Sequence, residues 1–230
     1  MICQIETEPV LAAVVHAQGV VLAIARHRLE SKERKGLSMF NLIDIQNMEG
    51  KITDAEVAYL ASCAATIKQH GVCLEVGSFR GKSTAAILHG LPKDAHLISI
   101  DLHMLNPTTK QGYETVETLV AYRNNIESHK QQVTQIIGYN VSVSKWFAYP
   151  INFAFFDCCK TFDGMKVIWD AWRPNFVPGS TIAFHDYNPQ QFGHNHFPGM
   201  VQFIEEVAMP ATTDHKRVDY IFSGVYNGQN

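Results

Sequence analysis

The sequence has little charge and no long cluster of basic residues. Charged side chains make up 18% of its 230 residues, and the formal net charge is −3. Binding to the phosphate backbone of nucleic acids requires lysine and arginine gathered on one surface. We therefore expect no nucleic-acid partner. The hydrophobic content of 46% is that of an ordinary globular protein, and the length suffices for one domain with a small appendage.

Cysteine is also scarce, and its spacing is not that of a zinc site. The five cysteines are Cys3, Cys63, Cys73, Cys158 and Cys159. Their odd number argues against a complete set of disulfides, and adjacent cysteines are poorly placed to bond with each other. We expect reduced thiols and a cytoplasmic location.

Long uninterrupted apolar segments are absent as well. The most apolar segment covers residues 9–25, but it contains a histidine, a glutamine and a glycine. A buried or dimer-forming helix is therefore favoured over a membrane span. Glu6 and Glu8 lie where a signal peptide carries positive charge, so we expect neither a signal peptide nor a membrane segment.

The first 50 residues are predicted to form a helical extension of the main domain. One helix is expected from Pro9 to about Glu33, because proline favours the first helical turn and charged residues crowd the end. Its wide apolar surface predicts packing on another element or on a second subunit, so the extension would act as a lid or in a homodimer. Leu37–Met48 is interpreted as a connector, and residues 51–230 as the main domain.

What the sequence does contain is a strand, a glycine-rich turn and a helix within residues 71–84. Val72–Val76 has the length and β-branching of a buried parallel strand, Gly77 and Gly81 follow, and Lys82–His89 is helical in character. Such a turn lets a ligand approach the backbone beside free helix N–H groups. Only three residues separate the two glycines, which excludes a P-loop, and Phe79 breaks the dinucleotide fingerprint.

Strands and helices alternate along the rest of the chain, as in a doubly wound, Rossmann-like α/β fold with a mainly parallel sheet. A capping box, Thr53 to Glu56, opens the first helix of the domain. The further strands are predicted at His96–Asp101, Val133–Gly138, Ile151–Asp157 and Ser180–Phe184, with one or two edge strands in Val218–Tyr226. The helices are predicted at Asp54–Gln69, Lys82–His89, Tyr113–His129, Met165–Trp172 and Gly199–Ala208.

Acidic or histidine residues lie at the ends of four of these strands. They are Glu75, Asp101, Asp157 and the pair His185-Asp186. In open α/β sheets the ligand binds beyond the carboxyl ends of the strands. The sequence therefore predicts a ligand site at that edge, with Asp101 placed to hydrogen-bond the hydroxyls of a ribose.

The pattern acid-x-Gly-x-x-x-Gly, Glu75 to Gly81, resembles the first motif of class I S-adenosylmethionine-dependent methyltransferases. The resemblance covers roughly residues 47–205, including the helix that leads into the turn. It implies S-adenosyl-L-methionine as the cofactor, with the methionine end on the turn and the adenine near Gly138-Tyr139-Asn140. The cofactor-binding residues implied are Glu75, Gly77, Ser78, Gly81, Ser83, Thr84, Asp101, Leu102, His103, Gly138, Tyr139, Asn140 and Asp157.

A second resemblance lies in the tetrad Asp157-Cys158-Cys159-Lys160. It is similar to the Asp-x-x-Lys of catechol and caffeoyl-CoA O-methyltransferases, in which the acid binds Mg²⁺ and the lysine deprotonates the acceptor. The flanking residues resemble a bacterial branch that includes cephalosporin-hydroxylase-like and sugar O-methyltransferase proteins. By position, the resemblance implies Asp157, His185 and Asp186 as ligands of Mg²⁺ or another divalent cation. The sequence departs from that branch at Cys159 and Lys160, and from the catechol type at His185.

These observations predict a methyltransferase acting on a hydroxyl of a small molecule such as a sugar, a phenol or a natural product. Methyl transfer is an in-line displacement that needs an activated nucleophile. A metal ion could activate the hydroxyl, and Lys160, with its ammonium destabilised, could take the proton. Two alternatives stay open. One is a metal-independent methyltransferase with His185 or Lys160 as the base, and the other is a non-catalytic protein that binds the cofactor or a partner.

Overall fold

The computed structural model of the chain describes residues 41–103, 116–190 and 197–228. The chain divides into two compact units, residues 1–37 and 38–230, and every described residue belongs to the second. The helix predicted from Pro9 to Glu33 lies outside the described residues, and with it the predicted dimer contact.

The described residues form a seven-stranded sheet in the order β3-β2-β1-β4-β5-β7-β6. Neighbouring strands from β3 to β5 run parallel, and β7 runs antiparallel to both β5 and β6. The sheet is therefore the mainly parallel, doubly wound sheet predicted from the sequence. The strands are β1 (Val72–Val76), β2 (His96–Asp101), β3 (Val133–Ile137), β4 (Ile151–Phe156), β5 (Phe176–Phe184), β6 (Thr212–Val218) and β7 (Ile221–Tyr226).

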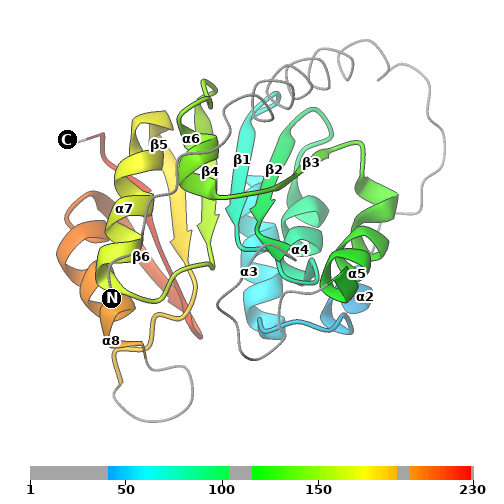
Figure 1. Ribbon diagram of the computed structural model, residues 1–230, viewed down its shortest axis with the longest axis horizontal. Coiled ribbons are helices and arrows are strands. Elements are labelled where there is room, and N and C mark those ends of the chain that lie inside the picture. Colours follow the sequence, from blue (N-terminus) through cyan, green and yellow to red (C-terminus); the bar gives the residue numbers. More distant parts are fainter. Residues whose placement is uncertain (1–40, 104–115, 191–196, 229–230) are drawn as a thin grey trace. The chain divides into compact units, whose positions relative to one another are not determined.

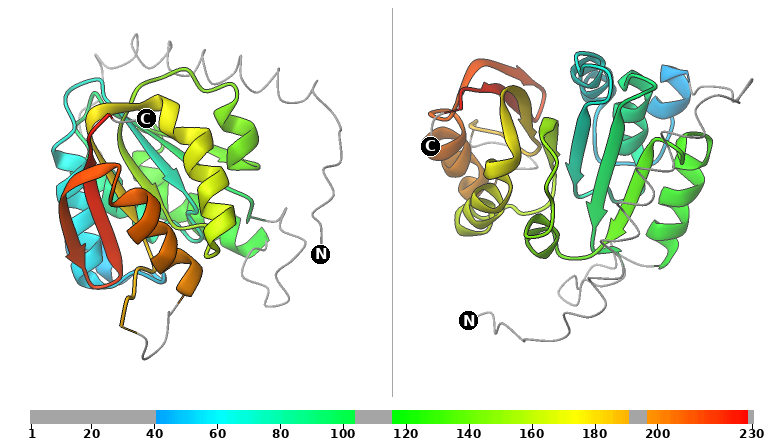
Figure 2. Two further views of the ribbon diagram at one scale, coloured as in Figure 1. Left: turned by 90° about the vertical axis from the view of Figure 1, so that its left-hand side faces the viewer. Right: turned by 90° about the horizontal axis from the view of Figure 1, so that it is seen from above.

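Helices cover both faces of this sheet (Figures 1 and 2). One layer contains α2 (Leu42–Gln46), α3 (Asp54–Ala65), α4 (Lys82–Gly90) and α5 (Val116–Ile126), the last continued by a 3₁₀ turn at Glu127–His129. The other layer contains α6 (Asn140–Ser144), α7 (Phe162–Trp172) and α8 (Pro198–Phe203), with a 3₁₀ turn at Arg173–Asn175 and a π-helical segment at Ile204–Ala208.

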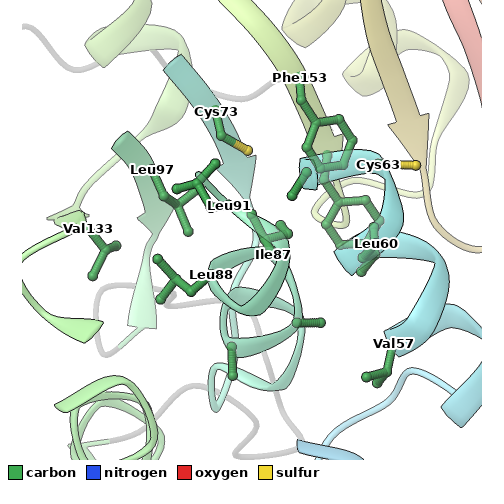
Figure 3. Packing of buried hydrophobic residues seen from close by; sticks show 14 of the residues in the cluster. Val57, Leu60, Cys63, Cys73, Ile87, Leu88, Leu91, Leu97, Val133 and Phe153 are labelled. Carbon is green, nitrogen blue, oxygen red and sulfur yellow. The ribbon is translucent and has the colours of Figure 1, made fainter. Parts of the chain in front are cut away.

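Each layer encloses its own apolar core. On the α3–α4 side, Leu60, Cys73, Ile87 and Phe153 converge from α3, β1, α4 and β4, as Figure 3 shows. On the opposite side the core is aromatic, and Trp169 of α7 packs against rings of β5, α8 and β7. Burial on both faces explains why β1 and β4 are almost continuously apolar in sequence.

Several elements differ from the sequence prediction. Helix α6 was not predicted, β6 lies before the segment predicted to supply the edge strands, and α3 ends at Ala65 rather than Gln69. The segment interpreted as a connector contains α2, in which Asn41 provides a capping box and Ile45 is fully buried in the α3–α4 core. Helix α7 begins three residues early, because the Thr161 side chain accepts a hydrogen bond from the Gly164 N–H at 3.3 Å. Strand β5 begins at Phe176, so the Pro178-Gly179 pair lies within the strand rather than before it.

Candidate active site

The glycine-rich turn after β1 is pressed against the end of β4. Gly77 has φ +91°, and a Cβ there would lie 2.1 Å from the main-chain oxygen of Asp157. Its N–H donates to the Ile100 carbonyl at 2.8 Å, while the Asp157 N–H donates to Val76 at 2.8 Å. Only glycine satisfies both the positive φ and the close approach. Gly81, with φ +85°, then starts α4.

A pocket opens at the carboxyl ends of β1, β2 and β4. Six of the residues predicted to bind a cofactor line it: Gly77, Ser78, Ser83, Asp101, Leu102 and Asp157. Its other lining residues are Gly50, Lys51, Ile52, Val76, Phe79, Lys82, Ile100 and Cys158. This position is where a doubly wound sheet binds its ligand.

Asp101, at the end of β2, holds the glycine turn in place. Its Oδ2 accepts hydrogen bonds from the main-chain N–H groups of Ser78 at 2.6 Å and Phe79 at 2.9 Å. Its Oδ1 accepts from the N–H of His103 at 2.7 Å. A carboxylate has about four acceptor positions. These three N–H groups occupy most of them, and the Ser78 hydroxyl is a weak fourth donor to Oδ2 at 3.4 Å.

Charged side chains converge where β4 and β5 end. The Lys160 ammonium donates to Asp157 Oδ1 at 2.6 Å and also pairs with Asp186. The Nδ1 atom of His185 lies 3.4 Å from one carboxylate oxygen of each aspartate. Asp186 has φ +64°, which turns the chain away from β5 at this point. Because Asp157 also lines the pocket, this charged cluster and the pocket adjoin.

Residues 74–187, which contain the turn, the pocket acid and most of the charged cluster, match a family described as a methyltransferase domain. The match spans 114 of the 230 residues, and this segment is thus similar to a methyltransferase domain. No curated protein matches the sequence. Within the part of the chain that the structure describes, no helix is both long enough and apolar enough to cross a membrane.

Solved methyltransferase structures share the fold of this chain. An O-methyltransferase from Bacillus cereus, in complex with S-adenosylhomocysteine, is 14% identical with a TM-score of 0.57, and the match covers 88% of this chain and 97% of that one. The O-methyltransferase TomG from Streptomyces achromogenes, in complex with S-adenosylmethionine, is 15% identical with a TM-score of 0.59. That match covers 90% of this chain and 96% of TomG. The Podospora anserina methyltransferase PaMTH1, bound to S-adenosylhomocysteine, is 12% identical with a TM-score of 0.58. That match covers 98% of this chain and 100% of PaMTH1.

Glu75 is buried next to the pocket and does not line it. Its buried carboxylate accepts hydrogen bonds from the hydroxyls of Ser83 at 2.7 Å, Thr84 at 2.6 Å and Ser99 at 2.7 Å. Burial raises the pKa of Glu75 to about 7 against the opposing effect of these donors. The Glu75 carboxylate therefore links β1 to α4 through Ser83 and Thr84, and to β2 through Ser99.

The remaining predicted cofactor residues lie outside the pocket. His103 is buried against the ring of Tyr122, with centroids 5.4 Å apart, and burial lowers its pKa. Tyr139 follows β3 and is 59% exposed, while Asn140 accepts a hydrogen bond from the Trp172 indole at 3.3 Å. Gly138 contacts the β2 end through its N–H, which donates to the Asp101 carbonyl at 3.1 Å. Gly81 caps α4 beside the pocket without lining it.

The ammonium of Lys160, which was expected to be destabilised, is instead stabilised in the charged cluster. Burial lowers the pKa of Lys160, but the charges of Asp157 and Asp186 outweigh it and raise that pKa above its usual value. Burial likewise opposes the cationic form of His185, yet Asp157 and its other acidic neighbours raise the His185 pKa to about 12. The same cations lower the pKa of Asp157 despite its burial. Both basic groups are therefore protonated at neutral pH, and neither is a resting-state base.

Glu56 is the contributor that sequence reasoning missed. Its Oε2 accepts the Thr53 N–H at 2.8 Å in the capping box, and lies 3.4 Å from His185 Nε2. Its Oε1 accepts the Tyr220 N–H at 2.8 Å, and the side chain is fully buried. The capping box was visible in sequence, but a contact across 129 positions was not. No signal separated Glu56 from an ordinary capping residue.

The proposed metal ligands come together, but a cation of the protein already lies between them. One donor atom from each of Asp157, His185 and Asp186 lies within 4.8 Å of the others. Lys160 binds both aspartates with its ammonium. Since a metal ion needs those carboxylate oxygens at about 2.0–2.6 Å, the observed arrangement does not fit a metal ion and the Lys160 ammonium together.

Proposed function

We propose that the protein transfers a methyl group from S-adenosyl-L-methionine to a hydroxyl group of a small molecule. The observation that carries the proposal is the junction at Asp157, which both lines the pocket after the glycine turn and belongs to the charged cluster. A cofactor in the pocket and a hydroxyl at the cluster would thus meet at one residue. The solved O-methyltransferases of the same fold support this reading.

The pocket residues fit the cofactor at both of its ends. At Gly77 the main chain of the turn is accessible to the methionine end of the cofactor. The start of α4 offers main-chain N–H groups to that same end. Asp101 would accept a ribose hydroxyl at the acceptor position that its three N–H donors leave, in place of the weak 3.4 Å contact of the Ser78 hydroxyl. S-adenosylmethionine supplies a methyl group activated on sulfonium sulfur. The chain's own contribution is to fix the acceptor oxygen in line with that group.

Lys160 is suited to bind the acceptor oxygen. An ammonium has three N–H donors, of which Asp157 and Asp186 take two. The third is left for the hydroxyl and stabilises its oxygen as negative charge develops. The ring of Phe197, with its centroid 5.9 Å from Nζ, covers this ammonium on one side. His185 keeps both aspartates oriented and is a positioning residue in this scheme.

We assign the hydroxyl proton to the Asp157 carboxylate, which is more exposed than that of Asp186, at 23% against 9%. Because the pKa of Asp157 is lowered, the carboxylate takes this proton only as the O–CH₃ bond forms, when the acceptor oxygen becomes strongly acidic. In this step the acceptor O–H bond breaks, its electron pair forms the new O–CH₃ bond, and the S–CH₃ bond breaks with its pair retained by sulfur. The products are the methyl ether, S-adenosylhomocysteine and a proton that Asp157 passes to water. The same sequence operates on a phenol or on a sugar hydroxyl.

The test measures cofactor binding and methyl transfer separately. Isothermal titration calorimetry with S-adenosylhomocysteine should give stoichiometric binding, weakened by Asp101→Ala. Transfer of radiolabelled methyl from S-adenosylmethionine to a panel of phenols, catechols and sugars should be lowered by Lys160→Ala with binding retained. Lys166→Ala, which removes a cation paired with Asp170 on the surface of α7, should alter neither. Absence of S-adenosylhomocysteine binding would refute the proposal, and binding without transfer to any acceptor class would favour the non-catalytic alternative.

A further inference from the structure

We propose that the Lys160 ammonium holds the place of a divalent metal ion among Asp157, Asp186 and His185, so that the site works without metal. This inference deepens the proposed function, since it concerns the acceptor site of the same reaction. It replaces the metal-assisted chemistry expected from sequence with a cation built into the chain.

The geometry of the cluster carries the inference. The donor atoms of Asp157, His185 and Asp186 lie within 4.8 Å of one another, a spacing that suits one cation in contact with all three residues. The cation found in contact with the two carboxylates is Nζ of Lys160. A metal ion held by the same oxygens would lie within a few ångströms of that ammonium, and like charges at such a distance repel strongly.

The lysine reaches this position because of where it lies in the chain. Asp157 directly follows β4, and Lys160 comes three residues later, immediately before Thr161 caps α7. This short link returns the side chain over the carboxyl end of β4 toward Asp186 at the end of β5. The Lys160 side chain is only 26% exposed, so its charge is held in the cluster rather than in bulk water.

The charges of the cluster nearly balance without a metal ion. The described residues place three carboxylates here, from Asp157, Asp186 and Glu56, and two basic groups, from Lys160 and His185. A neutral residue in place of Lys160 would leave the two aspartates with His185 as their only basic neighbour among the described residues of this cluster. Two carboxylates and a neutral imidazole are ligands that Mn²⁺ accepts, and binding would release the proton of His185. Removing the lysine should therefore create a metal site.

The experiment measures Mn²⁺ binding to the full chain by calorimetry and by the loss of the free-ion electron paramagnetic resonance signal. We expect the wild type to bind Mn²⁺ no better than Lys166→Ala, which removes an exposed cation of α7. Lys160→Ala should bind one Mn²⁺ at least tenfold more tightly than either. Adding Asp157→Asn to Lys160→Ala should abolish that gain, and thermal melting confirms which variants are folded.

Three results would overturn the inference. In the first, the wild type binds Mn²⁺ tightly and stoichiometrically, and Asp157→Asn removes this binding. In the second, EDTA abolishes wild-type turnover and Mn²⁺ restores it. In the third, Lys160→Ala folds but binds Mn²⁺ no better than the wild type. If Lys160→Ala does not fold, the wild-type measurement decides alone. Binding of S-adenosylhomocysteine, measured on the same samples, tests the proposed function independently. Each claim can therefore be refuted without deciding the other.

Discussion

Replacing Gly77 with alanine tests whether the contact between the turn and β4 builds the cofactor pocket. The new Cβ would lie 2.1 Å from the Asp157 main-chain oxygen, at a residue with φ +91°. The chain offers a matched control in Gly179, which has the same φ of +91° but nothing within 4 Å of the added atom. Comparing the two alanine variants separates backbone strain from the steric conflict.

The expected magnitudes follow from these two differences. Forcing alanine to a left-handed conformation costs about 1 kcal/mol, which should lower the Tm of Gly179→Ala by roughly 2–4 °C. Gly77→Ala adds an overpacking penalty, so its total cost is roughly 3 kcal/mol and its Tm should fall by roughly 6–12 °C. Because the clash is with main chain, no side-chain rotation relieves it, and Asp157 must move.

Thermal denaturation followed by circular dichroism gives the Tm values, and calorimetry with S-adenosylhomocysteine gives the affinities. Gly77→Ala should bind at least tenfold more weakly than the wild type, because its pocket wall shifts, whereas Gly179→Ala should bind normally. Equal Tm decreases in the two variants, or normal affinity in Gly77→Ala, would refute the claim that this approach shapes the pocket.

Three further predictions concern the carboxylates of Glu75, Glu56 and Asp157. Since the pKa of Glu75 is raised to about 7 from 4.5, its folded form retains a proton that the unfolded form has lost between these pH values. Stability should thus fall by about 3 kcal/mol from pH 4.5 to 7, and urea denaturation should show a flatter pH dependence for Glu75→Gln; identical slopes would contradict the assignment. Glu56→Ala should cost roughly 3–5 kcal/mol by urea denaturation, whereas Asp54→Ala, exposed in the same helical turn, should stay within about 0.5 kcal/mol; similar losses would argue against a buried contact. Asp157→Asn should lower methyl transfer roughly a hundredfold, while Asp170→Asn, on the surface of α7, should leave the rate intact; unchanged turnover in Asp157→Asn would remove it from the mechanism.

The sequence by itself determined the elements that local signals specify. The β-branched run Val72–Val76 and the strand His96–Asp101 occur in the structure with the predicted bounds. Gly77 and Gly81 both adopt positive φ, as a tight turn between strand and helix requires. These features depend on residues within a few positions of one another, and steric limits on φ act at that range.

The tertiary structure decided which charges meet, and therefore what each ionisable group does. Glu75 carries the acid of the first motif, yet three hydroxyls from α4 and β2 enclose it next to the pocket. Lys160 was expected to lose its proton readily, but Asp186, 26 positions further along the chain, holds it as a cation. Glu56 and His185 lie 129 positions apart and meet only because α3 packs beside the end of β5. A pKa depends on burial and on every nearby charge, and strands and helices bring those charges together from parts of the chain that no local pattern connects.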